Sequence, residues 1–88
     1  MSALAEELTI RDVRPADLDA VAELERISFP IPWKREFFAS EVGLAYRFNR
    51  VARAANGRLA GYVFCAFAAG EIHIHKIASA TEGTMDGR

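Results

Sequence analysis

Apolar and polar residues alternate in three stretches of the chain and recur with a helical period in the segment between the first two. Residues 8–13 (LTIRDV) alternate as a half-buried first strand does. From Pro15 onward, apolar residues come three or four positions apart, which predicts a helix with one buried stripe. The acidic Glu23 and Glu25 are expected to face away from that stripe. The stripe contains Leu18, Val21, Ala22, Leu24 and Ile27.

Two prolines in residues 29–33 (FPIPW) end this first helix. The residue before a proline is pushed out of the α region, and each proline fixes its own φ. The segment therefore predicts a stiff connector with an aromatic residue at either end. A second helix is predicted from Lys34 to about Val42, where Gly43 provides a suitable stop.

Three strands joined by short turns are predicted in the rest of the chain. The period changes to two over residues 46–54, and Asn56-Gly57 favours a hairpin turn because both residues tolerate positive φ. Residues 59–68 (LAGYVFCAFA) are almost all apolar, which predicts a central strand covered on both faces. Residues 71–78 (EIHIHKIA) alternate again. The order strand, helix, helix and three-stranded antiparallel meander predicts an α+β domain.

Length and composition are consistent with one small globular domain. The 88 residues are 51% hydrophobic, which is enough for a core, and 11 basic against 12 acidic side chains give a net charge of -1. This balance argues against nucleic acid or an anionic membrane as a partner. No apolar run approaches the roughly 20 residues that span a bilayer, so a cytoplasmic location is expected. We divide the chain into a tail (1–7), a domain (8–78) and a loose tail (79–88).

The order of these elements, together with three short motifs, resembles the GNAT family of N-acetyltransferases. The motifs are Phe29-Pro30-x-Pro32-Trp33 between the two helices, NGRLAGYVF at residues 56–64, and EIHI-x-KIA at residues 71–78. Within this family the chain is most similar to the RimI-type enzymes, which acetylate the N-terminal amine of ribosomal proteins. The resemblance spans residues 8–78 and about the first half of a family member, which implies a partial GNAT fold.

The resemblance implies acetyl-CoA as the cofactor and a strand edge as its site. Ile77, Ala78 and Ser79 fall on the family's Ile-Ala-Val-like triplet, whose backbone groups hold the acetyl and pantetheine part of the cofactor. Ser79 departs from the usual valine, and Lys76 departs from a frequent asparagine. An exposed strand edge offers N–H and C=O groups to an amide-rich arm, and an N–H aimed at the thioester carbonyl stabilises the oxyanion.

The resemblance also implies a protein or peptide N-terminus as the acceptor. In RimI-type enzymes the connector between the two helices borders the peptide site, which assigns Phe29, Ile31 and Trp33 to substrate binding. The alternative is that Phe29 and Trp33 are core anchors at a helix break.

The family continues after this point with a basic, glycine-rich loop that opens a helix and cradles the pyrophosphate. Residues 82–88 (EGTMDGR) stand in its place, and no residue after position 78 matches the family's general base or acid. We therefore assign no catalytic residue and expect the chain alone to be inactive. The alternative function is a self-associating interaction module with an exposed strand edge, expected to form homo-oligomers. A premature stop or a shifted reading frame would also explain the loss of pattern.

Structural roles are expected for the remaining polar groups. His73 and His75 lie two apart on a strand without a third ligand nearby, so a solvent-facing pair is favoured over a metal site or a base. Cys65 lies among apolar residues and is expected to be a buried, inert thiol. Three arginines are expected to form a solvated strand face rather than a basic stripe. They are Arg47, Arg50 and Arg53.

Overall fold

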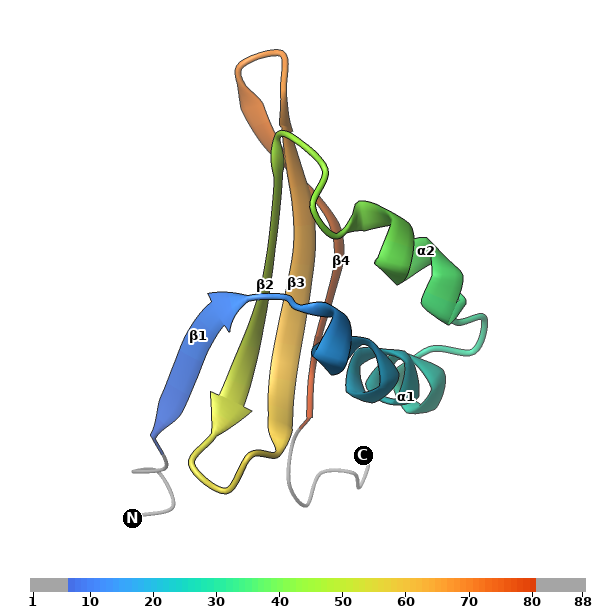
Figure 1. Cartoon of the computed structure of the whole chain (residues 1–88). Helices are drawn as coiled ribbons and strands as arrows, with labels where there is room; N and C mark the ends of the chain where they lie inside the picture. The colour runs from blue at the N-terminus through green and yellow to red at the C-terminus, as the bar shows by residue number, and fades with distance from the viewer. Residues whose placement is uncertain (1–6, 81–88) are drawn as a thin grey trace.

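The computed structural model describes residues 7–80 and places four strands in one antiparallel sheet. The strand order β1-β2-β3-β4 follows the sequence, although both helices intervene between β1 and β2 (Figure 1). This arrangement confirms the predicted α+β class and the order of its elements. The elements are β1 (Leu8–Asp12), the single 3-10 turn η2 (Pro15–Asp17), α1 (Leu18–Ser28), α2 (Arg35–Glu41), β2 (Arg47–Ala54), β3 (Leu59–Ala68) and β4 (Glu71–Ser79).

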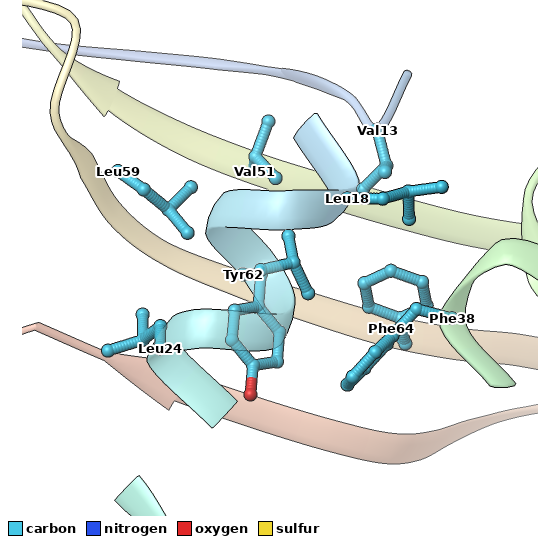
Figure 2. Packing of buried hydrophobic residues seen from close by; sticks show 9 residues of the cluster. Val13, Leu18, Leu24, Phe38, Val51, Leu59, Tyr62 and Phe64 are labelled. Carbon is cyan, nitrogen blue, oxygen red and sulfur yellow. The ribbon is translucent and has the colours of Figure 1, made fainter. Parts of the chain in front are cut away.

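The hydrophobic core lies between the two helices and one face of the sheet (Figures 1 and 2). Phe38 of α2 is fully buried, and its ring centroid lies 4.9 Å from that of Phe64 and 5.7 Å from that of Tyr62, both on β3. These edge-to-face contacts hold α2 against the sheet. The buried cluster consists of Val13, Leu18, Val21, Leu24, Phe38, Val51, Leu59, Tyr62 and Phe64.

The other face of the sheet has no helix or strand packed on it within residues 7–80. The prediction that residues 59–68 are covered on both faces is therefore wrong. Tyr62 and Phe64 point into the core, whereas Phe67, on the opposite face, is 42% exposed. Cys65 also lies on that face and is only partly buried, so the expected buried thiol is not found. Its Sγ is 2.9 Å from the carbonyl oxygen of Phe48.

We call this uncovered side the open face. Cross-strand pairing aligns its residues, for example Phe48 with Cys65 and Cys65 with Ile74. At its centre the small residues Ala52 and Gly61 help to leave a shallow hollow of about 490 Å³. Seven large apolar side chains of the open face are each at least 39% exposed: Leu8, Ile10, Phe48, Phe67, Ile72, Ile74 and Ile77.

Two residues of α1 lie on the opposite side from the one predicted. Glu25 is 0% exposed, whereas Ile27 is 64% exposed. The helix packs against α2, β3 and β4 together, which turns its Glu25 side inward and leaves Ile27 in solvent. Burial of Glu25 is possible because polar groups from three other segments meet its carboxylate, as described below.

A β-bulge interrupts the pairing of β3 with β4. Phe64 pairs with Lys76, whereas the next residue, Cys65, pairs with Ile74, so His75 is an extra residue on β4. The insertion shifts the alternation of the strand by one position. As a result Ile77 lies on the open face with Ile74, and Lys76 points to the helix side.

The bounds of the strands and of the second helix agree with the predicted ones to within two residues. The first helix, expected from Pro15, begins as the 3-10 turn η2 and becomes α-helical at Leu18. Ser79 still belongs to β4, at the start of the expected C-terminal tail. Residues 1–6 and 81–88, most of the two expected tails, lie outside the described residues, so this division of the chain stays a prediction. No helix within the described part of the chain is long and apolar enough to cross a membrane.

Candidate functional site

The first component of the site is the outer edge of β4. The N–H of Ala80 donates to the carbonyl of Ala60 at 2.8 Å, and Tyr62 faces Ala78 in the same register. In an antiparallel pair, hydrogen-bonded residues alternate with residues whose backbone groups point away from the neighbouring strand. The N–H and C=O groups of Ile77 and Ser79 therefore point outward, where no strand of residues 7–80 pairs with them.

Gly61 lets β3 approach β4 closely beside this edge. A β-carbon at Gly61 would lie 2.9 Å from the carbonyl oxygen of Ala78 and 3.4 Å from the Cα of Ser79. The first distance is shorter than carbon and oxygen atoms tolerate without movement. Glycine at this position therefore allows the backbone of Ala78 and Ser79 to lie this close to β3.

The second component is a buried polar cluster around Glu25. Tyr62 donates its hydroxyl hydrogen to Oε1 of the carboxylate, and the backbone N–H of Trp33 donates to Oε2 at 2.8 Å. The ammonium of Lys76 lies 3.1 Å from the same Oε2. A buried carboxylate without such partners would be strongly destabilising. The cluster thus joins α1, the connector, β3 and β4.

Burial and the nearby carboxylate both affect the Tyr62 hydroxyl. Loss of hydration raises the pKa of Tyr62 well above its ordinary value, and the hydrogen bond to Glu25 and the negative charge of Glu25 raise it further. Tyr62 therefore stays protonated and acts as a hydrogen-bond donor to Glu25 over the whole physiological pH range.

Aromatic rings enclose the Lys76 ammonium on its other side. The nitrogen lies 3.8 Å from the centroid of the Phe29 ring and 5.5 Å from that of Trp33. Both distances fall within the range of cation–π attraction. The lysine side chain is only 17% exposed.

The structure brings together only part of the predicted acceptor set. Phe29 and Trp33 lie together around Lys76, whereas the Ile31 side chain is 87% exposed. Trp33 also packs on the core, with its ring 5.2 Å from that of Phe38. The connector therefore anchors the core at Trp33, and its assignment to substrate binding stays a prediction.

Sequence reasoning missed Glu25, Tyr62 and Lys76 as members of one site. The one signal for this site was Lys76, which stands where an asparagine is frequent in the GNAT family, in a strand whose neighbouring residues alternate. Its partner lies 51 positions earlier in the chain on a helix, and helical spacing alone placed that residue in solvent.

A second polar cluster surrounds Asp17, which is 1% exposed, and it has a structural role. Arg11 binds the carboxylate through both terminal nitrogens at 2.7 and 2.8 Å, and Arg53 binds Oδ1 at 2.8 Å. The Arg14 backbone N–H donates to Oδ2 at 2.8 Å. This cluster ties the turn before α1 to the edge strand β1 and to its neighbour β2.

The three arginines of β2 do not form a common stripe. Arg53 pairs with Asp17 on the helix side, whereas Arg50 lies 2.6 Å from Asp12. Arg47 pairs with Glu41 of α2. The three guanidinium groups thus pair with three different carboxylates, so their charges are dispersed.

The two histidines occupy different positions relative to the sheet ladder. His73 pairs with Ala66 and lies 3.6 Å from Glu71, whereas His75 is the extra residue of the bulge. Within residues 7–80, no three His, Cys, Asp or Glu side chains gather as a metal site would require.

The two helices on one face, the four-stranded antiparallel sheet and the free backbone edge at β4 together define a partial GNAT fold. The ribosomal-protein-S18-alanine N-acetyltransferase from Escherichia coli has a similar solved structure, with 26% sequence identity and a TM-score of 0.72. The similarity covers 83% of this chain and 46% of that enzyme, so the chain spans about half of the enzyme's length. No protein-family model and no curated protein sequence matches the chain.

Proposed function

We propose that the chain provides the thioester-holding part of an acetyl-CoA-dependent N-acetyltransferase whose acceptor is a protein N-terminal amine. The observation that carries this proposal is the outward-pointing backbone of Ile77 and Ser79 on the free edge of β4. The similarity to an alanine N-acetyltransferase supports the reaction class and the acceptor.

In this proposal the β4 edge holds the pantetheine arm through backbone hydrogen bonds. An outward N–H of Ile77 or Ser79 is suited to donate to the thioester carbonyl, which becomes negatively charged as the acceptor amine attacks. The amine loses a proton, and the thiolate of CoA leaves with one. We assign neither proton transfer to a residue of this chain, and turnover by the 88-residue chain alone is not expected.

The proposal is tested by titrating the chain with acetyl-CoA while following backbone amide resonances by NMR. We expect shifts centred on Ile77 to Ser79. Binding is expected to be weak because residues 82–88 lack the basic, glycine-rich pattern that would hold the pyrophosphate. Absence of shifts along β4 would overturn the proposal.

Proline substitutions on β4 test which backbone groups are used. Ile77→Pro removes an outward N–H and leaves the ladder to β3 intact, since proline is tolerated on an edge strand when its nitrogen faces solvent. We expect Ile77→Pro to weaken acetyl-CoA binding at least tenfold, whereas Ile77→Val, which keeps the N–H, binds as the wild type does. Equal binding by both variants would exclude the Ile77 N–H as a contact.

A second candidate function is self-association. The open face presents seven exposed large apolar side chains, and such a patch is typical of an interaction surface. A second copy of the chain would cover both open faces as a sheet-on-sheet pair, and the β4 edge is a further route to association.

Light scattering across a concentration series tests this candidate, with dimers or larger species expected. Ile10→Glu and Ile74→Glu place charges on the open face and are expected to yield monomers. Ile31→Glu is the matched control because Ile31 is 87% exposed but lies on the connector. If only Ile77→Pro loses association, the contact between copies is at the β4 edge and not on the open face. A monomeric wild type would contradict self-association as a function.

A further inference from the structure

The Lys76 ammonium occupies an enclosure that other parts of the chain build. Its walls are the Glu25 carboxylate, 3.1 Å from the nitrogen, and the rings of Phe29 and Trp33 at 3.8 and 5.5 Å. Glu25 comes from α1, and both rings come from the connector. Lys76 alone comes from β4.

Contacts that do not involve the lysine hold the Glu25 carboxylate and the Trp33 ring in place. The Tyr62 hydroxyl and the Trp33 backbone N–H each hold one oxygen of the Glu25 carboxylate. The Trp33 ring is fixed by its contact with Phe38 in the core. Removal of the lysine side chain would therefore leave the carboxylate and the Trp33 ring at a vacated position that the Phe29 ring also borders.

We propose that Glu25, Phe29 and Trp33 form a binding site for a primary ammonium group, and that Lys76 fills this site in cis. The carboxylate supplies charge and accepts an N–H hydrogen bond, and the rings supply cation–π attraction. The requirement for an N–H favours a primary amine over a quaternary one. The four methylenes of Lys76 show that the approach to the site accepts an unbranched alkyl chain.

Lys76 thus closes the site to amine ligands in the wild-type chain. If the proposed acetyltransferase function holds, the ammonium site lies next to Ile77, whose backbone would hold the thioester. An acceptor amine would have to approach that thioester. The ammonium site itself does not depend on that function, because its contacts involve no cofactor.

Substitution of the lysine tests the proposal directly. Lys76→Ala vacates the site, and propylammonium replaces the lost side-chain end. Trp33 is the chain's only tryptophan, so its fluorescence reports on the site. We expect a saturable fluorescence change in Lys76→Ala with propylammonium chloride, and none in the wild type beyond that given by equal sodium chloride.

Matched variants and ligands separate the site from general effects of salt. Lys34, the only other lysine, lies exposed beside α2, and Lys34→Ala is expected to behave as the wild type does. Glu25→Gln combined with Lys76→Ala removes the carboxylate charge and is expected to bind propylammonium at least tenfold more weakly than Lys76→Ala. Propanol and tetramethylammonium are expected to bind at least tenfold more weakly than propylammonium.

Each outcome decides the proposal. A folded Lys76→Ala chain that shows no saturable response overturns it, as does equal binding by the double variant. If Lys76→Ala is unfolded, propylammonium must restore the folded state, because a ligand that binds only the folded chain stabilises it. Failure to refold at concentrations that leave the wild type folded also overturns the proposal. Acetyl-CoA is absent throughout, so these results do not depend on the proposed function.

Discussion

Tyr62 of β3 and Glu25 of α1 meet inside the core, where the phenolic hydroxyl donates a hydrogen bond to Oε1 of the carboxylate. The Tyr62 side chain is 4% exposed and Glu25 is 0% exposed. Neither group is open to solvent in the folded chain. The bond therefore couples the position of α1 to the central strand.

Removal of this hydroxyl is expected to lower stability. Tyr62→Phe leaves one oxygen of a buried carboxylate without its donor, which costs about 1–3 kcal/mol in the free energy of unfolding. Urea denaturation followed by Trp33 fluorescence measures the change. Tyr46→Phe is the control because Tyr46 is 70% exposed, and its midpoint is expected to stay close to that of the wild type. Equal midpoints for both variants would contradict the prediction.

Alkaline pH is expected to unfold the chain before Tyr62 ionises. Burial, the hydrogen bond and the charge of Glu25 raise the folded-state pKa of Tyr62, while the unfolded chain keeps a value of about 10. The unfolded state therefore loses this proton first, and stability decreases as the pH rises above about 10. A Tyr46→Phe chain has Tyr62 as its only tyrosine. Its tyrosinate absorbance should appear together with loss of circular dichroism, and an earlier appearance would refute the prediction.

Acid is expected to destabilise the chain through Asp17. The hydrogen bond from Arg11 is the largest cause that holds the pKa of Asp17 well below its ordinary value, with further contributions from Arg53 and the Arg14 N–H, while burial acts in the opposite direction. Stability from this group is present above the unfolded-state pKa of about 4 and decreases as the pH falls below it.

Asp17→Asn tests this contribution at neutral pH. It leaves two arginines without their shared carboxylate, and we expect a loss of about 3 kcal/mol together with a flatter dependence on pH below 4. Asp19→Asn is the control because Asp19 pairs with Arg35 at the surface and its side chain is 88% exposed. Its expected change is within about 0.5 kcal/mol. Similar changes in both variants would show that burial of Asp17 is not the cause.

Gly61→Ala is expected to displace β4. Replacement of glycine by alanine inside a strand ordinarily stabilises it by about 0.5–1 kcal/mol. Here the added carbon would lie 2.9 Å from the Ala78 carbonyl oxygen, so overpacking is expected to reverse the sign and cost about 1–3 kcal/mol. Amide shifts concentrated at Ala78 and Ser79 should accompany the loss. A more stable Gly61→Ala chain would contradict the close approach.

Most of the fold could be predicted because the relevant signals are local. The prolines of the connector and the Asn56-Gly57 turn act on their own backbone, and the strand Leu59–Ala68 was predicted with its observed bounds. The composition of residues 59–68 predicted cover on both faces, which the structure does not show within residues 7–80. Residues 59–68 are apolar on both sides, and such a strand does not show from its composition whether a second layer covers it.

The site was harder to predict because it depends on backbone details that sequence periods do not include. Strict alternation places Lys76 on the same side as Ile72 and Ile74, away from the helices. The extra residue His75 reverses this, so the lysine meets Glu25 inside the molecule. The burial of Glu25 could not be predicted for the same reason, since its charged partner is brought to it by tertiary contacts.

The bulge at His75 also determines which face of the sheet the residues after it take. A regular ladder that kept His75 paired would turn Lys76 toward the open face and place Ile77 on the side of Glu25. A buried carboxylate would then face an alkyl group, and an ammonium would lie among isoleucines. A deletion of His75 removes the extra residue instead, so Lys76 would follow Ile74 directly and both residues would keep their present faces. The faces of this strand therefore depend on the exclusion of one residue from the ladder and not on the side chain at position 75.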